Sequence, residues 1–214
     1  MKAIAVNGSP RRQWNTARLL EKALEGTAAA GAETRLVHLY DLDFRGCTSC
    51  FACKLNGGKS YGRCAMRDGL TPLLDEIHDA DALILGSPIY FLDATGEMRS
   101  FMERLCFQYG VYTDPFSSIF GRKMPTALVY TMNITEDGVA ASGLGRVLTT
   151  MRGVMQTIFG TCDMMLCTNT LQFEEYSLYE TALFDAAAKR ERRQETFPQD
   201  LEKAFLLGKR LLER

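Results

Sequence analysis

The chain has 214 residues, of which 46% are apolar, enough to fill the core of an α/β domain. Lys and Arg total 25 and Asp and Glu total 26, so no net field draws the chain to nucleic acid or to an anionic membrane surface. No apolar run approaches the ~20 residues that span a bilayer, and the N-terminus does not read as a secretion signal. We therefore expect a cytoplasmic protein without nucleic-acid or membrane partners, whose seven cysteines are not disulfide-bonded.

Apolar runs alternate with amphipathic stretches along the chain. Strands are predicted at 2–6, 34–39, 81–87, 124–132 and 162–168, and helices at 15–29, 70–79, 96–107, 143–159 and 198–212. Strand followed by helix, five times, predicts a parallel sheet with helices on both faces. Right-handed crossovers favour a flavodoxin-like, doubly wound, five-stranded sheet with strand order 2-1-3-4-5, formed by one domain over residues 1–214.

Three segments are longer than ordinary α/β loops, and each is a candidate for contact with a cofactor or a second subunit. Residues 44–69 hold clustered cysteines, 107–123 hold many aromatic residues, and 171–197 hold Tyr and Phe. The last segment also contains the charge run "KRERR" at 189–193, which we expect to form a solvated helix face.

The first strand is followed by "GSPRRQWNT" at residues 8–16, a polar loop that leads into a helix. In the predicted sheet this loop lies where the strand order reverses, which is where ligands bind. It contains neither GxxxxGK[ST] nor GxGxxG. The side chains of Ser9, Asn15 and Thr16 can donate to a phosphate, Arg11 adds positive charge, and backbone N–H groups at the helix start complete the site. The alternative is an ordinary capped helix behind an exposed loop.

The third strand ends in "GSPIYFLDATGEMRSFMERL", residues 86–105, on the other side of the same crevice. Pro88 lacks an N–H and is expected to turn the chain out of the sheet. Ile89, Tyr90 and Phe91 then lie at the carboxyl edge, where they can flank a planar ring. An exposed anion contact at a helix start contributes about 0.3 to 1 kcal/mol, whereas nanomolar binding needs about 12 kcal/mol, so a flat apolar part of the ligand must be buried nearby.

The motifs "NGSPR...NT" and "SPIYF...G.MR.FMER" resemble those of NADPH-dependent FMN reductases and iron-sulfur flavoproteins of the flavodoxin-like superfamily, over nearly the whole chain. The resemblance implies FMN as cofactor and NAD(P)H as electron donor. It implies that the phosphate is held by Ser9, Arg11, Asn15 and Thr16, that the isoalloxazine contacts Pro88, Ile89, Tyr90 and Phe91, and that a third flavin loop contains Thr131, Met132 and Asn133. Trp14 departs from the family pattern, which more often has a small residue here, and is expected to pack on a neighbouring subunit.

The stretch "CTSCFACKLNGGKSYGRC" places Cys47, Cys50 and Cys53 in a CxxCxxC run, with Cys64 ten residues further on. Three thiolates at this spacing can bind one face of a four-iron four-sulfur cluster, with a fourth ligand from farther along the chain. Iron-sulfur flavoproteins carry a four-cysteine motif at this place, with a shorter last gap. Three interpretations are open: a four-iron four-sulfur cluster, a loop that binds no metal, and a zinc site.

The sequence thus predicts an FMN-dependent oxidoreductase in which the flavin carries the chemistry and no catalytic side chain is required. Electrons pass from NAD(P)H to a small-molecule acceptor, such as a quinone or free flavin, or to a redox protein. One alternative is an electron-transfer module that takes electrons from a ferredoxin through its own cluster, and another is a sensor whose cysteines respond to oxidant or zinc. The resemblance also implies a homodimer or homotetramer.

Overall fold

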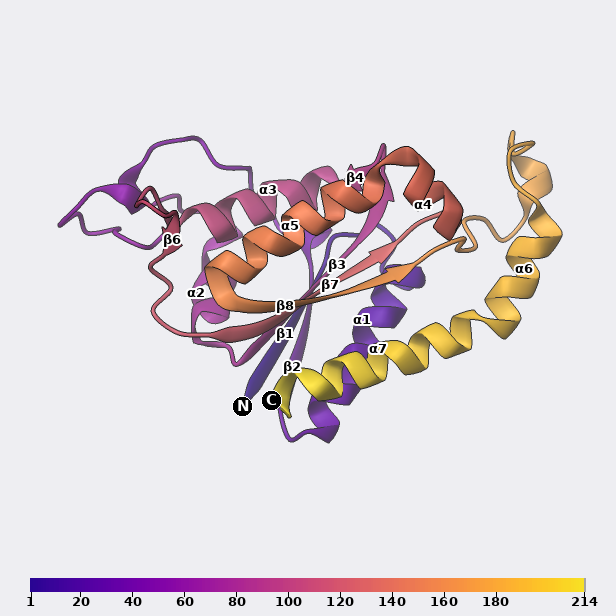
Figure 1. The fold of residues 1–214 in the computed structure, drawn as a ribbon, viewed down its shortest axis with the longest axis horizontal. Helices are drawn as coiled ribbons and strands as arrows, with labels where there is room; N and C mark the ends of the chain where they lie inside the picture. Colours follow the sequence, from indigo (N-terminus) through magenta and orange to yellow (C-terminus); the bar gives the residue numbers. More distant parts are fainter. Residues whose placement is uncertain (214) are drawn as a thin grey trace.

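The computed structural model describes residues 1–213 and has a central parallel sheet (Figure 1). Its five long strands are β1 (Lys2–Asn7), β2 (Glu33–His38), β3 (Ala82–Tyr90), β7 (Met124–Thr131) and β8 (Gly160–Cys167). They lie in the order β2-β1-β3-β7-β8, which confirms the predicted doubly wound fold class. A short sixth strand, β4 (Asp93–Ala94), pairs antiparallel with the end of β3 and is absent from the predicted elements.

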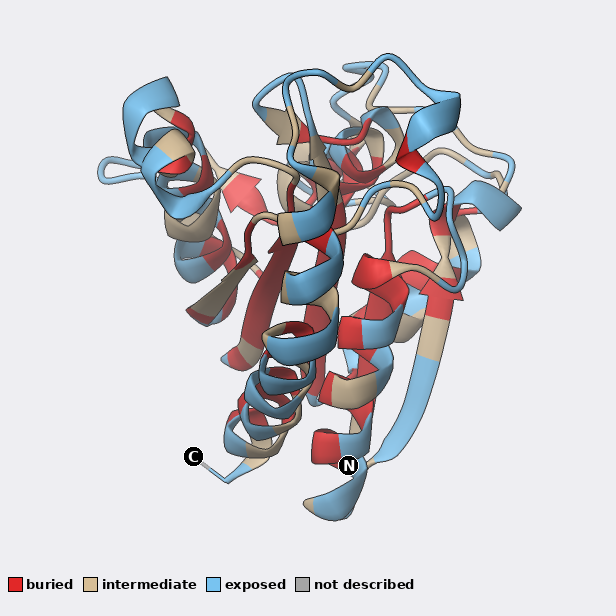
Figure 2. Ribbon diagram, turned by 90° about the vertical axis from the view of Figure 1, so that its right-hand side faces the viewer, coloured by how far each residue is buried: buried red, intermediate tan, exposed pale blue. Residues whose placement is uncertain are grey.

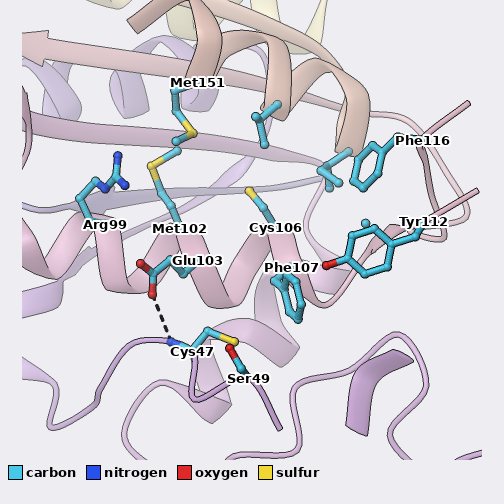
Figure 3. Close-up of a pocket in the computed structure, with 13 residues that line it drawn as sticks. Cys47, Ser49, Arg99, Met102, Glu103, Cys106, Phe107, Tyr112, Phe116 and Met151 are labelled. Carbon is cyan, nitrogen blue, oxygen red and sulfur yellow. Dashed lines mark hydrogen bonds between the residues drawn. The ribbon is translucent and has the colours of Figure 1, made fainter. Parts of the chain in front are cut away.

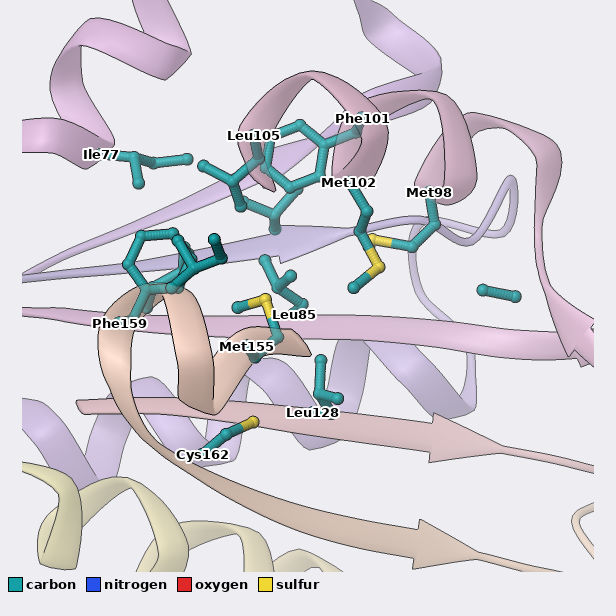
Figure 4. Packing of buried hydrophobic residues seen from close by; sticks show 14 of the residues in the cluster. Ile77, Leu85, Met98, Phe101, Met102, Leu105, Leu128, Met155, Phe159 and Cys162 are labelled. Atoms are coloured by element: carbon teal, nitrogen blue, oxygen red, sulfur yellow. The ribbon is translucent and has the colours of Figure 1, made fainter. Parts of the chain in front are cut away.

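Helices cover both faces of the sheet (Figure 1). One face carries α1 (Asn15–Ala29) and α7 (Phe197–Leu212), and the other carries α2 (Thr71–Asp79), α3 (Gly96–Phe107) and α5 (Leu144–Phe159). Apolar side chains of the helices meet those of the strands in two cores, one on each face, and the larger is shown in Figure 4. Figure 2 shows the result, with central strands buried and the outer faces of the helices exposed. The sheet is therefore a rigid base whose carboxyl edge presents the connecting loops.

The first and last helices pack at very short range, and two glycines make this possible. A Cβ atom added at Gly208 would lie 1.8 Å from the carbonyl oxygen of Ala23, and one added at Gly26 would lie 2.0 Å from that of Phe205. Only residues without a side chain allow the two backbones to approach this closely. The crossing fixes α7 against α1 and brings the segment before α7 close to the first loop.

The three long segments contain elements that the sequence patterns do not predict. Residues 44–69 are irregular apart from a short 3-10 helix at Ala52–Lys54, whereas 107–123 form a hairpin of β5 (Gly110–Val111) and β6 (Ser117–Ser118). The segment 171–197 contains a 3-10 turn at Tyr176–Leu178 and the helix α6 (Ala186–Glu195). Outside these segments, Leu39–Asp41 form a 3-10 turn and Glu136–Ser142 form α4. None of the helices in residues 1–213 combines the length and the apolar character needed to cross a bilayer.

Candidate functional site

A cavity of about 510 Å³ opens at the carboxyl edge of the sheet, where the strand order reverses. We call it the carboxyl-edge cavity. All the residues predicted to bind the cofactor line it except Phe91: Ser9, Arg11, Asn15, Thr16, Pro88, Ile89, Tyr90, Thr131, Met132 and Asn133. The remaining lining residues are Trp14, Thr170, Leu171, Gln172, Phe173 and Tyr179. The three predicted loops and a fourth segment, 170–179, therefore meet around one cavity of a size suited to a small-molecule ligand.

The start of α1 forms one end of this cavity and has no cap of its own. The N-cap residue, Trp14, makes no side-chain hydrogen bond to the helix, and the first turn contains no acidic residue. Asn15, Thr16 and Ala17 are nevertheless buried. The first N–H groups of a helix need acceptors, and the helix dipole favours an anion there. The Thr16 and Thr131 hydroxyls, 2.8 Å apart, tie this end to the third predicted loop.

Segment 170–179 forms one wall of the cavity and is hydrogen-bonded to the first loop. Trp14 Nε1 and Asn15 Nδ2 both donate to the carbonyl oxygen of Leu171, over 3.1 Å and 2.8 Å. Arg11 Nη1 donates to the carbonyl oxygen of Gln172 over 2.6 Å. The side chains of Arg11 and Asn15, predicted as phosphate ligands, thus hold the chain's own backbone here. Trp14 also contacts this segment of its own chain, and its expected contact with another subunit stays a prediction.

Cations of α6 reach the same loops. Arg193 Nη1 donates to Asn15 Oδ1 over 2.7 Å, and its guanidinium lies 4.1 Å from the ring centroid of Phe197. Lys189 Nζ donates to the carbonyl oxygen of Asn133 over 2.5 Å. Burial lowers the pKa of Lys189 to about 8. The expectation of a solvated face at 189–193 is therefore wrong for Lys189, which is 3% exposed, because a charge run does not show what the helix packs against.

Phe91 lies apart from the other predicted residues. Phe91 and Leu92 form the two-residue turn between β3 and β4, and both have positive φ, 49° and 66°. Such a turn matches the twist of a two-stranded hairpin. The Phe91 side chain is fully exposed at its tip, while Tyr90 is about half exposed and lines the cavity. The structure therefore places Phe91 outside the cavity lining, because it lies at the tip of this hairpin, and its contact with the ring stays a prediction.

The four predicted metal-ligating cysteines line a second, smaller cavity. Cys47, Cys50, Cys53 and Cys64 surround it with Arg104, Phe107 and Gln108, among others. Burial raises the pKa of the Cys53 thiol. We call this the cysteine cavity. Within residues 1–213, however, no three His, Cys, Asp or Glu side chains are placed so that they could hold a metal ion.

Buried polar atoms without partners occur at both cavities. Among the described residues these side-chain atoms are Asn133 Oδ1, at the carboxyl-edge cavity, and Arg104 Nε, Arg104 Nη2 and Gln108 Nε2, at the cysteine cavity. The third guanidinium nitrogen of Arg104 donates to Asp68 Oδ2 over 2.5 Å. A buried polar atom without a partner costs about 1 to 3 kcal/mol. One buried acceptor without a partner thus lies beside the first cavity, and three such donors lie beside the second.

A third cavity, of about 480 Å³, lies between α3, α5 and the β5–β6 hairpin (Figure 3). Met102, Met151 and Phe116 are among its largely apolar walls, and Cys47 and Phe107 line both it and the cysteine cavity. Glu103 accepts a hydrogen bond from the backbone N–H of Cys47 over 3.3 Å at its rim. The aromatic insert 107–123 therefore borders this cavity and does not line the carboxyl-edge cavity.

Sequence reasoning misses the residues that segment 170–193 contributes to the site. They include Leu171 and Gln172, whose backbone carbonyls accept from the first loop, and the stacked rings of Phe173 and Tyr179, whose centroids are 4.0 Å apart. Lys189 and Arg193 complete the set. The unusual length of the segment and its Tyr and Phe content are the available signal. No spacing rule connects it to a loop more than 150 residues earlier.

Comparison with known proteins agrees with the fold and the motifs. The model of the family "NADPH-dependent FMN reductase" matches residues 1–162. An iron-sulfur flavoprotein of Archaeoglobus fulgidus is 34% identical over 105 residues, 49% of this chain and 46% of the relative. One of Methanocaldococcus jannaschii is 36% identical over 104 residues, 49% of this chain and 51% of the relative. The matched part thus spans about half the length of these curated relatives.

Solved structures resemble the protein over nearly its whole length. An NAD(P)H:quinone oxidoreductase from Methanothermobacter marburgensis superimposes with a TM-score of 0.67 at 16% identity, covering 99% of this chain and 98% of the other. An azoreductase from Bacillus anthracis gives a TM-score of 0.68 at 14% identity, covering 98% and 99%. At these identities the likeness concerns the fold. The family model, which matches about three quarters of the sequence, identifies the chain as a member of the NADPH-dependent FMN reductase family.

Proposed function

We propose that the protein is an FMN-dependent oxidoreductase that takes electrons from NAD(P)H and passes them to a quinone, a flavin or another small acceptor. One observation carries this proposal: the carboxyl-edge cavity joins a buried, uncapped helix start to a wall that includes Pro88, Ile89 and Tyr90. The first feature suits a phosphate and the second suits a planar ring. Family membership supports FMN and NAD(P)H as the partners of this site.

The residues around the cavity fit FMN in three ways. The first-turn N–H groups of α1, with the hydroxyls of Ser9 and Thr16, provide donors for the phosphate. Arg11 adds positive charge at the same end, and burial lowers its pKa without removing that charge at neutral pH. The unused acceptor of Asn133 suits a ring N–H group.

The flavin supplies the hydride and electron chemistry when it is bound. The chain's own residues bind, orient and shield it. Tyr90 and Ile89 would flank the ring, and Asn133 would orient it if its unpartnered Oδ1 accepted a hydrogen bond from the ring. Phe173 and Tyr179, both in segment 170–179, stack on each other at the cavity wall, and we expect them to limit the access of water to the flavin.

Anaerobic reduction tests this function. The protein is loaded with FMN, freed of excess flavin, and mixed with NADPH or NADH while its visible absorbance is recorded. We expect the flavin absorbance to disappear with at least one nicotinamide and to return when a quinone is added without oxygen. Absorbance that persists with both nicotinamides but disappears with dithionite would contradict a nicotinamide-dependent reductase.

We propose, as a second candidate function, that the cysteine loop holds a four-iron four-sulfur cluster and passes electrons between FMN and a redox protein. Four cysteines line one cavity. The sulfur atoms of a cluster accept hydrogen bonds, and the nitrogens of Arg104 and Gln108 that lack partners could donate to them. The similar curated proteins named iron-sulfur flavoproteins support this proposal. Cluster binding requires the loop to draw its thiols together, since no metal-binding group is preformed among residues 1–213.

Iron and sulfide analysis after anaerobic purification tests the cluster. We expect about four irons per chain, loss of the iron in Cys53→Ser, and retention in a control, Cys162→Ala, whose thiol is buried in β8. Flavin without iron or sulfide would contradict the cluster and leave a metal-free loop. Stoichiometric zinc would instead establish the zinc interpretation.

We propose that the chain works as a homodimer or homotetramer with the β5–β6 hairpin in the contact. Tyr112 and Phe116 are 72% and 50% exposed, side by side with ring centroids 6.4 Å apart. Large apolar rings exposed together are typical of interaction surfaces. Light scattering should give a multiple of the monomer mass, and a lower multiple for Tyr112→Ser with Phe116→Ser. A monomeric unmodified protein would contradict the proposal.

A further inference from the structure

Lys189 is a buried cation whose ammonium contacts no carboxylate among the ion pairs of residues 1–213. It is the only buried residue of α6, an otherwise polar helix. Its ammonium group donates to the Asn133 carbonyl and lies 5.2 Å from the ring centroid of Phe184. Arg192, which carries the same charge, lowers the pKa of Lys189 further. Burying such a charge opposes folding, so a function in the loaded protein is the physical reason to keep it.

The group directly in front of Lys189 is Asn133, which lines the carboxyl-edge cavity. Its carbonyl oxygen accepts from Lys189, and its Nδ2 donates to Gln172 Oε1 over 2.5 Å. Its Oδ1 is buried and unused. A buried acceptor without a partner therefore lies at this edge of the cavity, and the positive charge of Lys189 lies behind it. The complementary ligand edge carries an N–H donor next to an atom that bears negative charge.

We propose that Lys189 is a positioning residue that fixes Asn133 against the pyrimidine edge of FMN and favours the reduced, negatively charged form of the cofactor. This inference rests on the proposed function. When NAD(P)H transfers a hydride it is oxidised to NAD(P)⁺, and the flavin ring takes up two electrons and one proton, which leaves one negative charge on the ring. A cation near that charge stabilises the reduced form more than the neutral, oxidised form and so raises the reduction potential. Lys189 lies beyond the residues that the family model matches.

The test compares binding of oxidised and reduced FMN in variants of the full chain. Lys189→Met removes the charge, and Lys189→Gln removes it while keeping a hydrogen-bond donor for Asn133. Arg190→Gln is the matched control, because it removes the same charge from the next residue, whose side chain is exposed. In both Lys189 variants we expect the affinity for reduced FMN to fall about tenfold more than that for oxidised FMN, which lowers the two-electron potential by about 30 mV. Lys189→Arg should keep the potential close to that of the unmodified protein.

A purely structural role gives a different result. If Lys189 only shapes the loop, Lys189→Met and Lys189→Gln weaken both forms of FMN equally, and the potential does not change. That outcome would overturn the inference, as would an equal fall in potential in Arg190→Gln. Absence of FMN binding by the unmodified protein would refute the proposed function itself, and this distinguishes the two failures.

Discussion

Replacing Lys189 by Met should stabilise the FMN-free protein at neutral pH, although we propose that Lys189 favours reduced FMN in the FMN-bound protein. Burial lowers the Lys189 pKa from 10.5 to about 8 in the folded chain. This difference corresponds to about 3 kcal/mol of unfavourable free energy for the charged form. Losing the hydrogen bond to the Asn133 carbonyl costs about 1 kcal/mol. The net gain in the free energy of unfolding is therefore about 2 kcal/mol at neutral pH.

The pH dependence gives this prediction its sign. Between the folded pKa of about 8 and the unfolded value of 10.5, the unfolded chain binds more protons at Lys189 than the folded chain does. The unmodified protein should therefore gain stability as the pH rises through this window, whereas Lys189→Met should lack that gain. Burial lowers the pKa of Lys189 most, the positive charge of Arg192 lowers it further, and the loop after β7 packs the uncharged carbonyl of Asn133 against the ammonium.

Urea unfolding of the FMN-free proteins near pH 7 and near pH 10 measures both quantities. We expect the advantage of Lys189→Met to shrink at the higher pH, and Arg190→Gln to show little change at either. If Lys189→Met is more stable than the unmodified protein by the same amount at both pH values, the electrostatic explanation is refuted. If Lys189→Met is less stable near pH 7, burial of the Lys189 ammonium does not destabilise the folded protein.

Other substitutions test the helix crossing and the first loop. Gly208→Ala should destabilise the protein by about 3 kcal/mol or more in urea unfolding, because its Cβ would collide with the Ala23 carbonyl 1.8 Å away. Gly153→Ala is the control: its Cβ on α5 would meet nothing within 4 Å, so this variant should be as stable as the unmodified protein or more stable. Arg11→Ala combined with Asn15→Ala should release FMN during gel filtration and should make segment 170–179 more sensitive to proteolysis, since both side chains hold its backbone. Unchanged flavin retention in the double variant would contradict the assignment of the first loop.

The regular part of the fold can be predicted because its signals are local. The predicted helices at 15–29 and 96–107 have the bounds that the structure shows, and the other long helices and strands differ by one to three residues at an end. Alternating strands and helices have few right-handed arrangements, so the position of the ligand crevice follows from the order of the elements alone. This is why the amino-acid sequence is sufficient to place Ser9, Thr16 and Tyr90 at one cavity.

The parts that cannot be predicted depend on contacts between distant segments. Phe91 and Tyr90 are neighbours in one aromatic run, and only the turn into β4 separates their environments. Lys189 and Arg190 look alike in a charge run, yet one is buried against Asn133 and the other is exposed. A helix face is expected at 189–193, but the bounds of this helix are missing from the predicted elements because it is polar nearly all round and has no apolar periodicity. Tertiary packing, rather than local propensity, decides such positions.

The phosphate end of the carboxyl-edge cavity can be tested most directly by titrating the FMN-free protein with FMN and with riboflavin, which lacks the phosphate. We predict one FMN per chain, bound at least about a hundredfold more tightly than riboflavin, because several charge-assisted hydrogen bonds at the start of α1 are made to the phosphate alone. Thr16→Glu, which places a carboxylate at that helix start, should remove most of this preference. Equal affinity for the two flavins, or no binding of either, would contradict the assignment of this cavity.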